Sequence, residues 1–124
     1  MSKVKSSKAK GRRLQNFVRD ALRYVFIEKW TKLPKLEDDD IKSQTMGMCG
    51  EDIVLSPAAK KIIPYSFECK NKERLDLWKS LEQAEGNSQD RNPCLVFKRN
   101  RSKVYVALEF EHFLELIDPN LKEI

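Results

Sequence analysis

Between residues 14 and 26, apolar side chains recur every three or four positions, which is the spacing of one face of an α-helix. They are Leu14, Phe17, Val18, Ala21, Leu22, Val25 and Phe26. The other faces carry arginine, aspartate and glutamine, so the helix must cover its apolar face with another element, which we expect to be a sheet. Pro34 and the acidic residues 37–40 then end this segment, and we interpret Asp38–Asp40 as a solvated turn or N-cap rather than a metal cluster.

The rest of the chain alternates short β-like runs with helical segments. Four runs are rich in branched and aromatic residues and are bounded by turn residues, at positions 52–55, 65–69, 94–97 and 104–108. Apolar residues at helical spacing predict a helix over residues 75–85, and a last helix over residues 110–117 that ends before Pro119. This order predicts an α/β (α+β) fold in which a central mixed sheet is flanked by helices.

Composition limits what such a chain can be. Its 124 residues are 40% hydrophobic, which is enough for one compact core, and no apolar run approaches the ~20 residues of a membrane span. Three cysteines, Cys49, Cys69 and Cys94, lack the paired spacing of a zinc site, and we expect a reducing, cytoplasmic location. The single histidine, His112, lies in an apolar stretch, so we expect a surface or partly packed residue rather than a catalytic base.

Charge is distributed unevenly along the chain. Residues 1–35 carry 11 basic and two acidic residues, a net charge of +9, whereas residues 36–124 carry 13 basic and 17 acidic residues, a net charge of −4. We expect residues 1–10 to form a flexible basic tail ahead of a single domain over residues 11–124. A basic tail attracts nucleic-acid phosphates by counterion release, although a role in solubility alone is the alternative.

Three residues carry the candidate chemistry. Asp52 begins one predicted strand, while Glu68 and Lys70 lie two positions apart at the end of the next and therefore share a face. If the two strands pair, Asp52 faces Glu68, and the two carboxylates with the Cys69 backbone carbonyl form an oxygen site suited to Mg²⁺ or Mn²⁺. Such an ion activates water and neutralises phosphate charge, and Lys70 can assist the attacking water. An ordinary cross-strand salt bridge is the alternative.

The arrangement of these residues resembles the PD-(D/E)XK nuclease superfamily, and especially the small Holliday junction resolvase-like endonucleases encoded by bacteriophages. The superfamily motif matches Asp52 and Glu68-x-Lys70, with Glu51 at the position of the name-giving proline. The similarity extends over residues 8–117 and includes the segments "KGRRLQNFVRDAL", "MGMCGEDIVLSPAAK", "SFECKN", "LEQAE" and "NRSKVYVAL". It implies a restriction-endonuclease-like αβββαβ core with a magnesium-dependent hydrolytic site.

The same resemblance assigns supporting residues. Gln15 stands where resolvases carry an acid in the first helix. Gln83 stands where many members place a glutamine near the site, with an exposed helix residue as the alternative. In resolvases, the loop matching residues 43–50 approaches the scissile backbone, so Ser43 and Thr45 are candidate phosphate contacts, with a simple turn as the alternative. The other candidate DNA contacts are basic: Lys10, Arg12 and Arg13 near the N-terminus, and Arg99, Arg101 and Lys103 in the "KRNRSK" hairpin.

We therefore expect a metal-dependent endodeoxyribonuclease that cuts branched DNA, such as a four-way junction, as a homodimer. Another nuclease of the superfamily, acting on duplex, nicked or foreign DNA, is the first alternative, and a catalytically inactive nucleic-acid-binding protein is the second. If the protein is phage-encoded, the expected location is the cytoplasm of the bacterial host. Apolar residues available for a dimer interface are Leu77, Trp78, Phe113 and Leu116.

Overall fold

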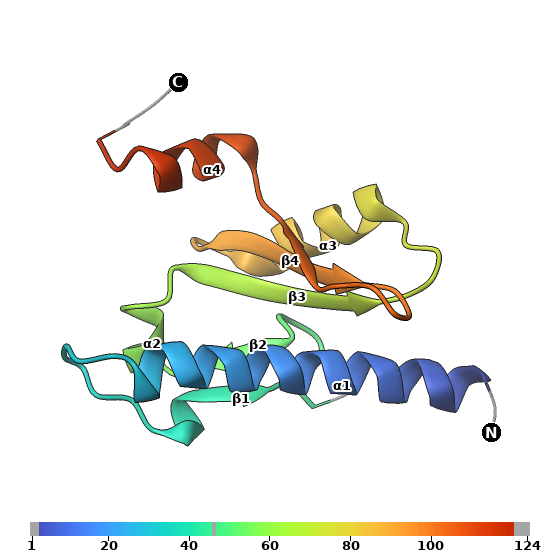
Figure 1. The fold of residues 1–124 in the computed structure, drawn as a ribbon, viewed down its shortest axis with the longest axis horizontal. Coiled ribbons are helices and arrows are strands. Elements are labelled where there is room, and N and C mark those ends of the chain that lie inside the picture. Colours follow the sequence, from blue (N-terminus) through green and yellow to red (C-terminus); the bar gives the residue numbers. More distant parts are fainter. Residues whose placement is uncertain (1–2, 46, 121–124) are drawn as a thin grey trace.

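The computed structural model describes residues 3–45 and 47–120 and arranges them in layers (Figure 1). Helix α1 (Lys3–Arg23) runs along one side of the molecule and ends in a single π-turn, η1 (Tyr24–Glu28). Four of the seven residues on the predicted apolar face pack inward, with Leu14 and Val18 buried and Leu22 and Phe26 partly buried, whereas Phe17, Ala21 and Val25 are exposed. The amphipathic helix and its sheet partner are thus confirmed.

The N-terminal basic segment differs from its prediction. Residues 3–10, which we expected to form a flexible tail, are the first turns of α1, and residues 1–2 lie outside the described part. The segment contains alanine and lysine, which favour helix, and no glycine or proline before Gly11. Once the packed part of α1 has formed, each further residue adds one hydrogen bond, so the helix extends backwards through the charged region.

Five strands form two sheets. After the 3₁₀ turn η2 (Asp38–Asp40), strand β1 (Ile41–Ser43) pairs antiparallel with β2 (Ile53–Leu55). In the second sheet, β3 (Tyr65–Asn71) pairs parallel with β4 (Asn92–Lys98), and β4 pairs antiparallel with β5 (Tyr105–Ala107). The expected single central sheet is therefore divided, but the Asp52 N–H donates to the Phe67 carbonyl oxygen at 3.0 Å and holds the two parts together.

Helices connect and cover the larger sheet. The short α2 (Pro57–Lys60) links β2 to β3, and α3 (Leu77–Ser88) links β3 to β4. Helix α1 lies on the opposite side of β3 from α3 (Figure 1). The predicted fold class is confirmed: a mixed α+β structure with a three-stranded mixed sheet flanked by helices, compatible with a restriction-endonuclease-like core. None of the described helices is long and apolar enough to cross a membrane.

The faces of β3 determine where its side chains go. Phe67 and Cys69 are buried in the main core with residues of α1, β1 and β2. Ser66 and Glu68 alternate with them and contact α3 instead, through the backbone and side chain of Asn87. The main apolar core therefore lies on one side of this strand, and a buried polar layer lies on the other.

The final helix, α4 (Phe110–Ile117), is confirmed but stands apart from the layers (Figure 1). None of its residues is buried, and Phe110, Phe113, Leu116 and Ile117 are exposed. A hydrogen bond of 2.6 Å between the Tyr65 hydroxyl and His112 Nε2 attaches it to β3, so His112 is the partly packed residue that we expected.

Candidate active site

Asp52 and Glu68 lie side by side because the backbone groups of the two residues that flank Glu68 in β3 both bind Asp52. The Asp52 N–H donates to the Phe67 carbonyl oxygen, and Asp52 Oδ2 accepts a hydrogen bond of 2.7 Å from the Cys69 N–H. The residue that opens β2 is thus fixed against the middle of β3. The two carboxylates line a cavity of about 530 Å³ that opens between α1, α3 and the loop before β2.

Glu68 is buried, with 2% of its surface exposed, and two side chains approach its carboxylate. Lys70 Nζ lies 3.9 Å from one oxygen, and the Asn87 side-chain amide donates to the other at 3.4 Å. The same Asn87 amide also donates to the Gly50 carbonyl oxygen at 3.3 Å. Asn87 therefore connects α3 both to Glu68 and to the chain leading into Asp52.

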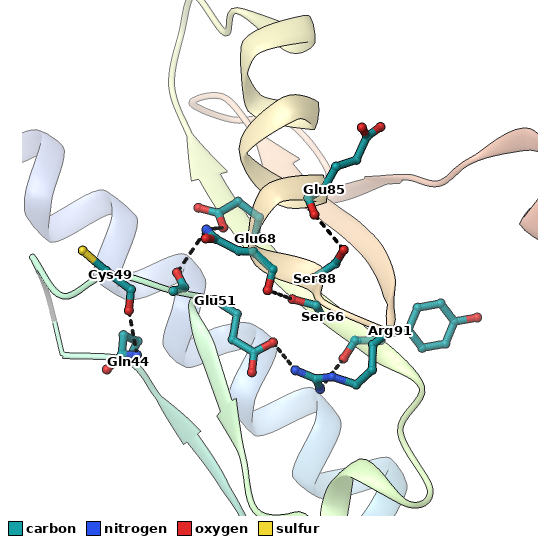
Figure 2. Close-up of polar contacts among 11 residues, drawn as sticks. Gln44, Cys49, Glu51, Ser66, Glu68, Glu85, Ser88 and Arg91 are labelled. Carbon is teal, nitrogen blue, oxygen red and sulfur yellow. Dashed lines mark hydrogen bonds and ion pairs between the residues drawn. The ribbon is translucent and has the colours of Figure 1, made fainter.

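A partly buried ion pair supports the other side of Asp52. The neighbouring Glu51 pairs with the Arg91 guanidinium, which also donates to the Tyr65 carbonyl oxygen at 2.9 Å (Figure 2). Arg91 in turn donates its N–H to the Ser88 carbonyl oxygen at the end of α3. Glu51 thus joins the start of β2 to the start of β3 and the end of α3, instead of only replacing the proline of the superfamily motif.

Burial opposes the ionisation of both acids at this site. Burial and, after it, the adjacent Asp52 carboxylate raise the pKa of Glu68 to about 7, although the Asn87 hydrogen bond and Lys70 oppose this rise. Burial also raises the pKa of Asp52, against the opposing effects of the Cys69 N–H, Glu68, Lys70 and Gln15. A bound cation would stabilise the ionised form of both acids and lower their pKa values.

The donors available here fit a hard divalent cation. The described residues contain no group of three or more acidic, histidine or cysteine side chains that could hold a metal. Instead, the cavity combines the Asp52 and Glu68 carboxylates with the amide of Gln15, which is 7% exposed. A site of two carboxylates completed by neutral oxygens suits Mg²⁺ or Mn²⁺ better than zinc, which takes nitrogen and sulfur ligands.

The predicted supporting residues divide between this cavity and its surroundings. Gln83 and Thr45 line the cavity, together with Lys8 and Lys10 of α1. Ser43 instead donates its hydroxyl to Asn16 Oδ1 at 2.9 Å and is used within the fold. Met46, in the same loop, lies outside the described residues.

The predicted basic contacts lie farther along the surface. Arg13 and Arg101 line a second cavity together with Lys10. Arg99 and Arg101 lie on the β4–β5 turn and line a shallow hollow with Arg74, which follows β3. Arg12 and Lys103 are exposed. Trp78, a candidate for the dimer interface, is 76% exposed and therefore lies outside the core.

Sequence reasoning missed Asn87 and Arg91. The sequence pattern predicted that the helix would stop at Gly86–Asn87, whereas α3 continues to Ser88 and carries Asn87 to the site. The partners of Asn87 and Arg91 are 19 and 40 residues away in the chain, so no local spacing indicates these contacts. The one available signal was the acid at position 51, because an acid that directly precedes a predicted buried strand requires a partner where it leaves the solvent.

Comparison with known proteins agrees with this geometry. Residues 6–123 match the family described as "Phage putative PDDEXK endonuclease", and the chain belongs to this family. It is also similar to "Protein D14" of Escherichia phage T5, with 29% identity over 117 residues, covering 83% of this chain and 71% of that protein. No solved structure matches the chain. The resemblance to PD-(D/E)XK nucleases of phages is thereby confirmed.

Proposed function

We propose that the protein is a divalent-metal-dependent endodeoxyribonuclease that acts on branched DNA. Membership of the endonuclease family makes it a nuclease. The observation that supports metal dependence is the pair of Asp52 and Glu68, held by hydrogen bonds beside Lys70. Four lysines line the same cavity as these acids: Lys8 and Lys10 of α1, Lys70 of β3, and Lys72 directly after β3. An acidic centre within a basic rim suits a phosphodiester whose cleavage uses a bound cation.

Each site residue has a role in this proposal. Asp52, Glu68 and the Cys69 carbonyl would hold Mg²⁺ or Mn²⁺, which supplies charge neutralisation at phosphate and lowers the pKa of a bound water. Lys70 stabilises negative charge that develops on the phosphate oxygens and orients the attacking water. Gln15 and Gln83 complete the lining of the cavity, where their amides can hold water or phosphate in position. No covalent enzyme intermediate is required.

The branched substrate and a homodimer form the finer part of the proposal. One chain has a single Asp52/Glu68/Lys70 site, whereas resolving a four-way junction takes two cuts at symmetry-related positions, which a twofold dimer supplies. Exposed apolar residues support an interface: Leu77 and Trp78 on α3, and Phe113 and Leu116 on α4. Sedimentation at micromolar concentration tests it, and a strict monomer would contradict it.

A cytoplasmic location is also part of the proposal. The described structure contains three free cysteines and no disulfide, which fits a reducing compartment. Cys69 and Cys94 are buried, and burial raises the pKa of both thiols, so both stay protonated and unreactive at neutral pH. For a phage-encoded nuclease, this compartment is the host cytoplasm.

The test is a panel of labelled four-way junction, flap, nicked, linear duplex and RNA substrates, each incubated with Mg²⁺, Mn²⁺ or EDTA. We expect cutting of junctions with either ion and none with EDTA or with Glu68→Gln. The control is Glu82→Gln, which removes an exposed acid from α3 and should leave cutting unchanged. Equal cutting of junction and duplex would reject the branched-DNA assignment, and cutting in EDTA would reject metal dependence.

A further inference from the structure

A second cavity of about 550 Å³ adjoins the cavity lined by Asp52 and Glu68, which is named the catalytic cavity for the role proposed above. Lys10 and Asn71 line both cavities, so the two are neighbours along the groove between α1 and the end of β3. The cations of the second cavity come from three places in the chain: Lys10 and Arg13 from α1, Lys98 from the end of β4, and Arg101 from the β4–β5 turn. A strand leaving the catalytic cavity past Asn71 would therefore enter the second cavity directly.

The charge of the two cavities differs in kind. Asp52, Glu68 and Glu73 line the catalytic cavity, whereas no acid lines the second. Within residues 3–45 and 47–120, no ion pair engages any of the four cations that line the second cavity. Unpaired cations around a concave surface attract a polyanion and release its counterions on binding.

The second cavity also contains apolar surface that a phosphate would not need. Leu14 is buried beneath it, while Phe17 and Val104 face the opening with 58% and 37% of their surface exposed. Sites that combine a basic groove with an accessible aromatic ring bind single-stranded nucleic acid, because the ring stacks on a base while the cations hold the backbone. A base inside a duplex is already stacked on both sides and cannot use Phe17 in this way.

The turn that supplies Arg101 is held in place before any ligand binds. Arg101 has a φ of +63°, and the Arg99 N–H and Ser102 Oγ bond at 3.0 Å across the turn. The Asn100 N–H donates to Glu73 at 3.0 Å, and the Lys72 N–H donates to the Lys98 carbonyl oxygen at 3.1 Å, which joins the turn to the end of β3. Preorganisation lowers the entropy that a bound strand would have to lose.

We propose that the second cavity binds an unpaired strand of the DNA substrate immediately beside the phosphodiester that is cut. This inference rests on the proposed nuclease function and adds flaps, whose arm is unpaired, to the branched substrates, since the arms of a four-way junction are all paired. Arg13, Lys98 and Arg101 hold the backbone of the arm, and Phe17 stacks on one of its bases.

Binding without metal tests the inference independently of cleavage. Fluorescence anisotropy in EDTA compares a duplex carrying a 3′ or 5′ single-stranded arm with a fully paired duplex of the same length. We expect Phe17→Ala to weaken binding of armed DNA by roughly 5- to 150-fold and to leave the paired duplex nearly unchanged. Phe17→Trp, which keeps a stacking ring, should retain the preference for arms, whereas Phe17→Leu should lose it.

Two matched controls separate this result from general effects. Phe110→Ala removes another exposed ring, from α4. Lys60→Gln with Lys61→Gln removes two exposed charges at the end of α2, on the side of the molecule away from the β4–β5 turn (Figure 1). Arg13→Gln with Arg101→Gln should flatten the salt dependence of arm binding by at most about 1.4 in log–log slope, at ~0.7 for each contact to a single strand.

Equal loss on armed and paired DNA, or no loss with Phe17→Ala and Phe17→Leu, would overturn the inference and leave only a general phosphate surface. Thermal unfolding followed by circular dichroism checks that each variant is folded. If the wild-type protein bound arms as expected but cut no DNA with any metal, the nuclease proposal would fail and the binding site would stand. If the protein cut DNA with metal but showed no preference for arms, the nuclease proposal would stand and the arm-binding site would be rejected.

Discussion

The two adjoining cavities differ in how their polar groups are held. In the catalytic cavity, the carboxylates of Asp52 and Glu68 are fixed by the Cys69 N–H, the Asn87 amide and Lys70, and Glu68 is almost wholly buried. In the second cavity, Arg13 and Arg101 are exposed and lie outside the ion pairs of the described chain. The folded protein thus holds the carboxylates of the first cavity in position, whereas the arginines of the second cavity remain available to a ligand.

This difference indicates how each region responds to substitution. A buried group that several partners hold in place cannot be replaced by a neighbouring residue, so its loss strongly reduces the one reaction step in which it acts. An exposed cation contributes to an electrostatic potential that several neighbouring cations also supply, so its removal weakens DNA binding only slightly. We therefore expect substitutions in the catalytic cavity to reduce cleavage and those in the second cavity to reduce binding.

The largest effect is expected from the three central residues. Asp52→Asn, Glu68→Gln and Lys70→Ala should each lower the cleavage rate by about 100-fold or more, because each removes charge that the transition state requires. DNA binding in EDTA should stay the same or strengthen for the two acid variants, since they remove negative charge beside phosphate. Single-turnover cleavage and anisotropy on one junction measure the two quantities.

Either acid variant could contradict this assignment. A fully active Glu68→Gln protein would show that Glu68 is not a metal ligand. Normal activity in Asp52→Asn alone would show that one ligand has been misplaced. A parallel fall in binding and cleavage in all three variants would indicate damage to the fold, which circular dichroism detects.

A smaller effect is expected from Asn87, which holds Glu68 without belonging to the motif. Asn87→Ala should lower activity by about 10- to 100-fold, the range typical of residues that orient metal ligands. Because the Asn87 hydrogen bond lowers the pKa of Glu68, its removal should also move the acidic limb of the pH–rate profile to higher pH. A purely structural role would lower activity without this shift.

The control for Asn87 is the exposed Glu85 in the same turn of α3. Glu85→Ala should leave both the rate and the pH profile unchanged. If Asn87→Ala and Glu85→Ala behave alike, Asn87 has no positioning role at Glu68.

The pKa of Glu68 also predicts how stability depends on pH when metal is absent. Its pKa is about 7 in the folded protein against an ordinary value of 4.5, so between these values the folded state holds more protons than the unfolded state. The free energy of unfolding should therefore fall as pH rises through this window, and Asp52 acts in the same direction. Glu68→Gln should reduce that fall, as measured by urea unfolding at pH 5 and pH 8 in EDTA.

Adding Mg²⁺ sharpens this test. The ion binds the ionised carboxylates, so it should stabilise the wild-type protein more at pH 8 than at pH 5 and have little effect on Glu68→Gln. A wild-type protein whose stability rises with pH over this window in EDTA would show that Glu68 is not the buried, proton-retaining acid described here.

Much of the fold could be predicted because it depends on local patterns. The apolar spacing of α1 and α4 and the branched runs of β3 and β4 determined the elements and their order. Strand β1 was not predicted, because three residues with one buried side chain carry too little pattern. The helical start of α1 was also not predicted, because charge composition says little about how far a packed helix continues.

The site could be predicted only in part for a related reason. The motif and the resemblance indicated Asp52, Glu68, Gln15 and Gln83, and the structure brings all four to one cavity. Asn87, Arg91 and the second cavity depend on segments that meet only after folding. The hydrogen bond from Ser43 to Asn16 of α1 is of the same kind, since it joins residues 27 positions apart.

The smallest effect is expected from basic residues that line neither of the two cavities. Arg12 and Lys103 are exposed at the margins of the basic surface, on α1 and beside the β4–β5 turn. Arg12→Gln and Lys103→Gln should each weaken binding to every DNA shape about equally, because an exposed cation meets phosphate without reading structure. Each should flatten the salt dependence on duplex DNA by at most ~0.9 in log–log slope, and cleavage at saturating enzyme should stay normal. Salt titrations of binding, run beside Arg13→Gln and Arg101→Gln, measure the contrast. If the marginal and cavity variants show the same loss and the same indifference to unpaired arms, the two cavities do not differ in function, and the basic surface acts as one uniform phosphate-binding field.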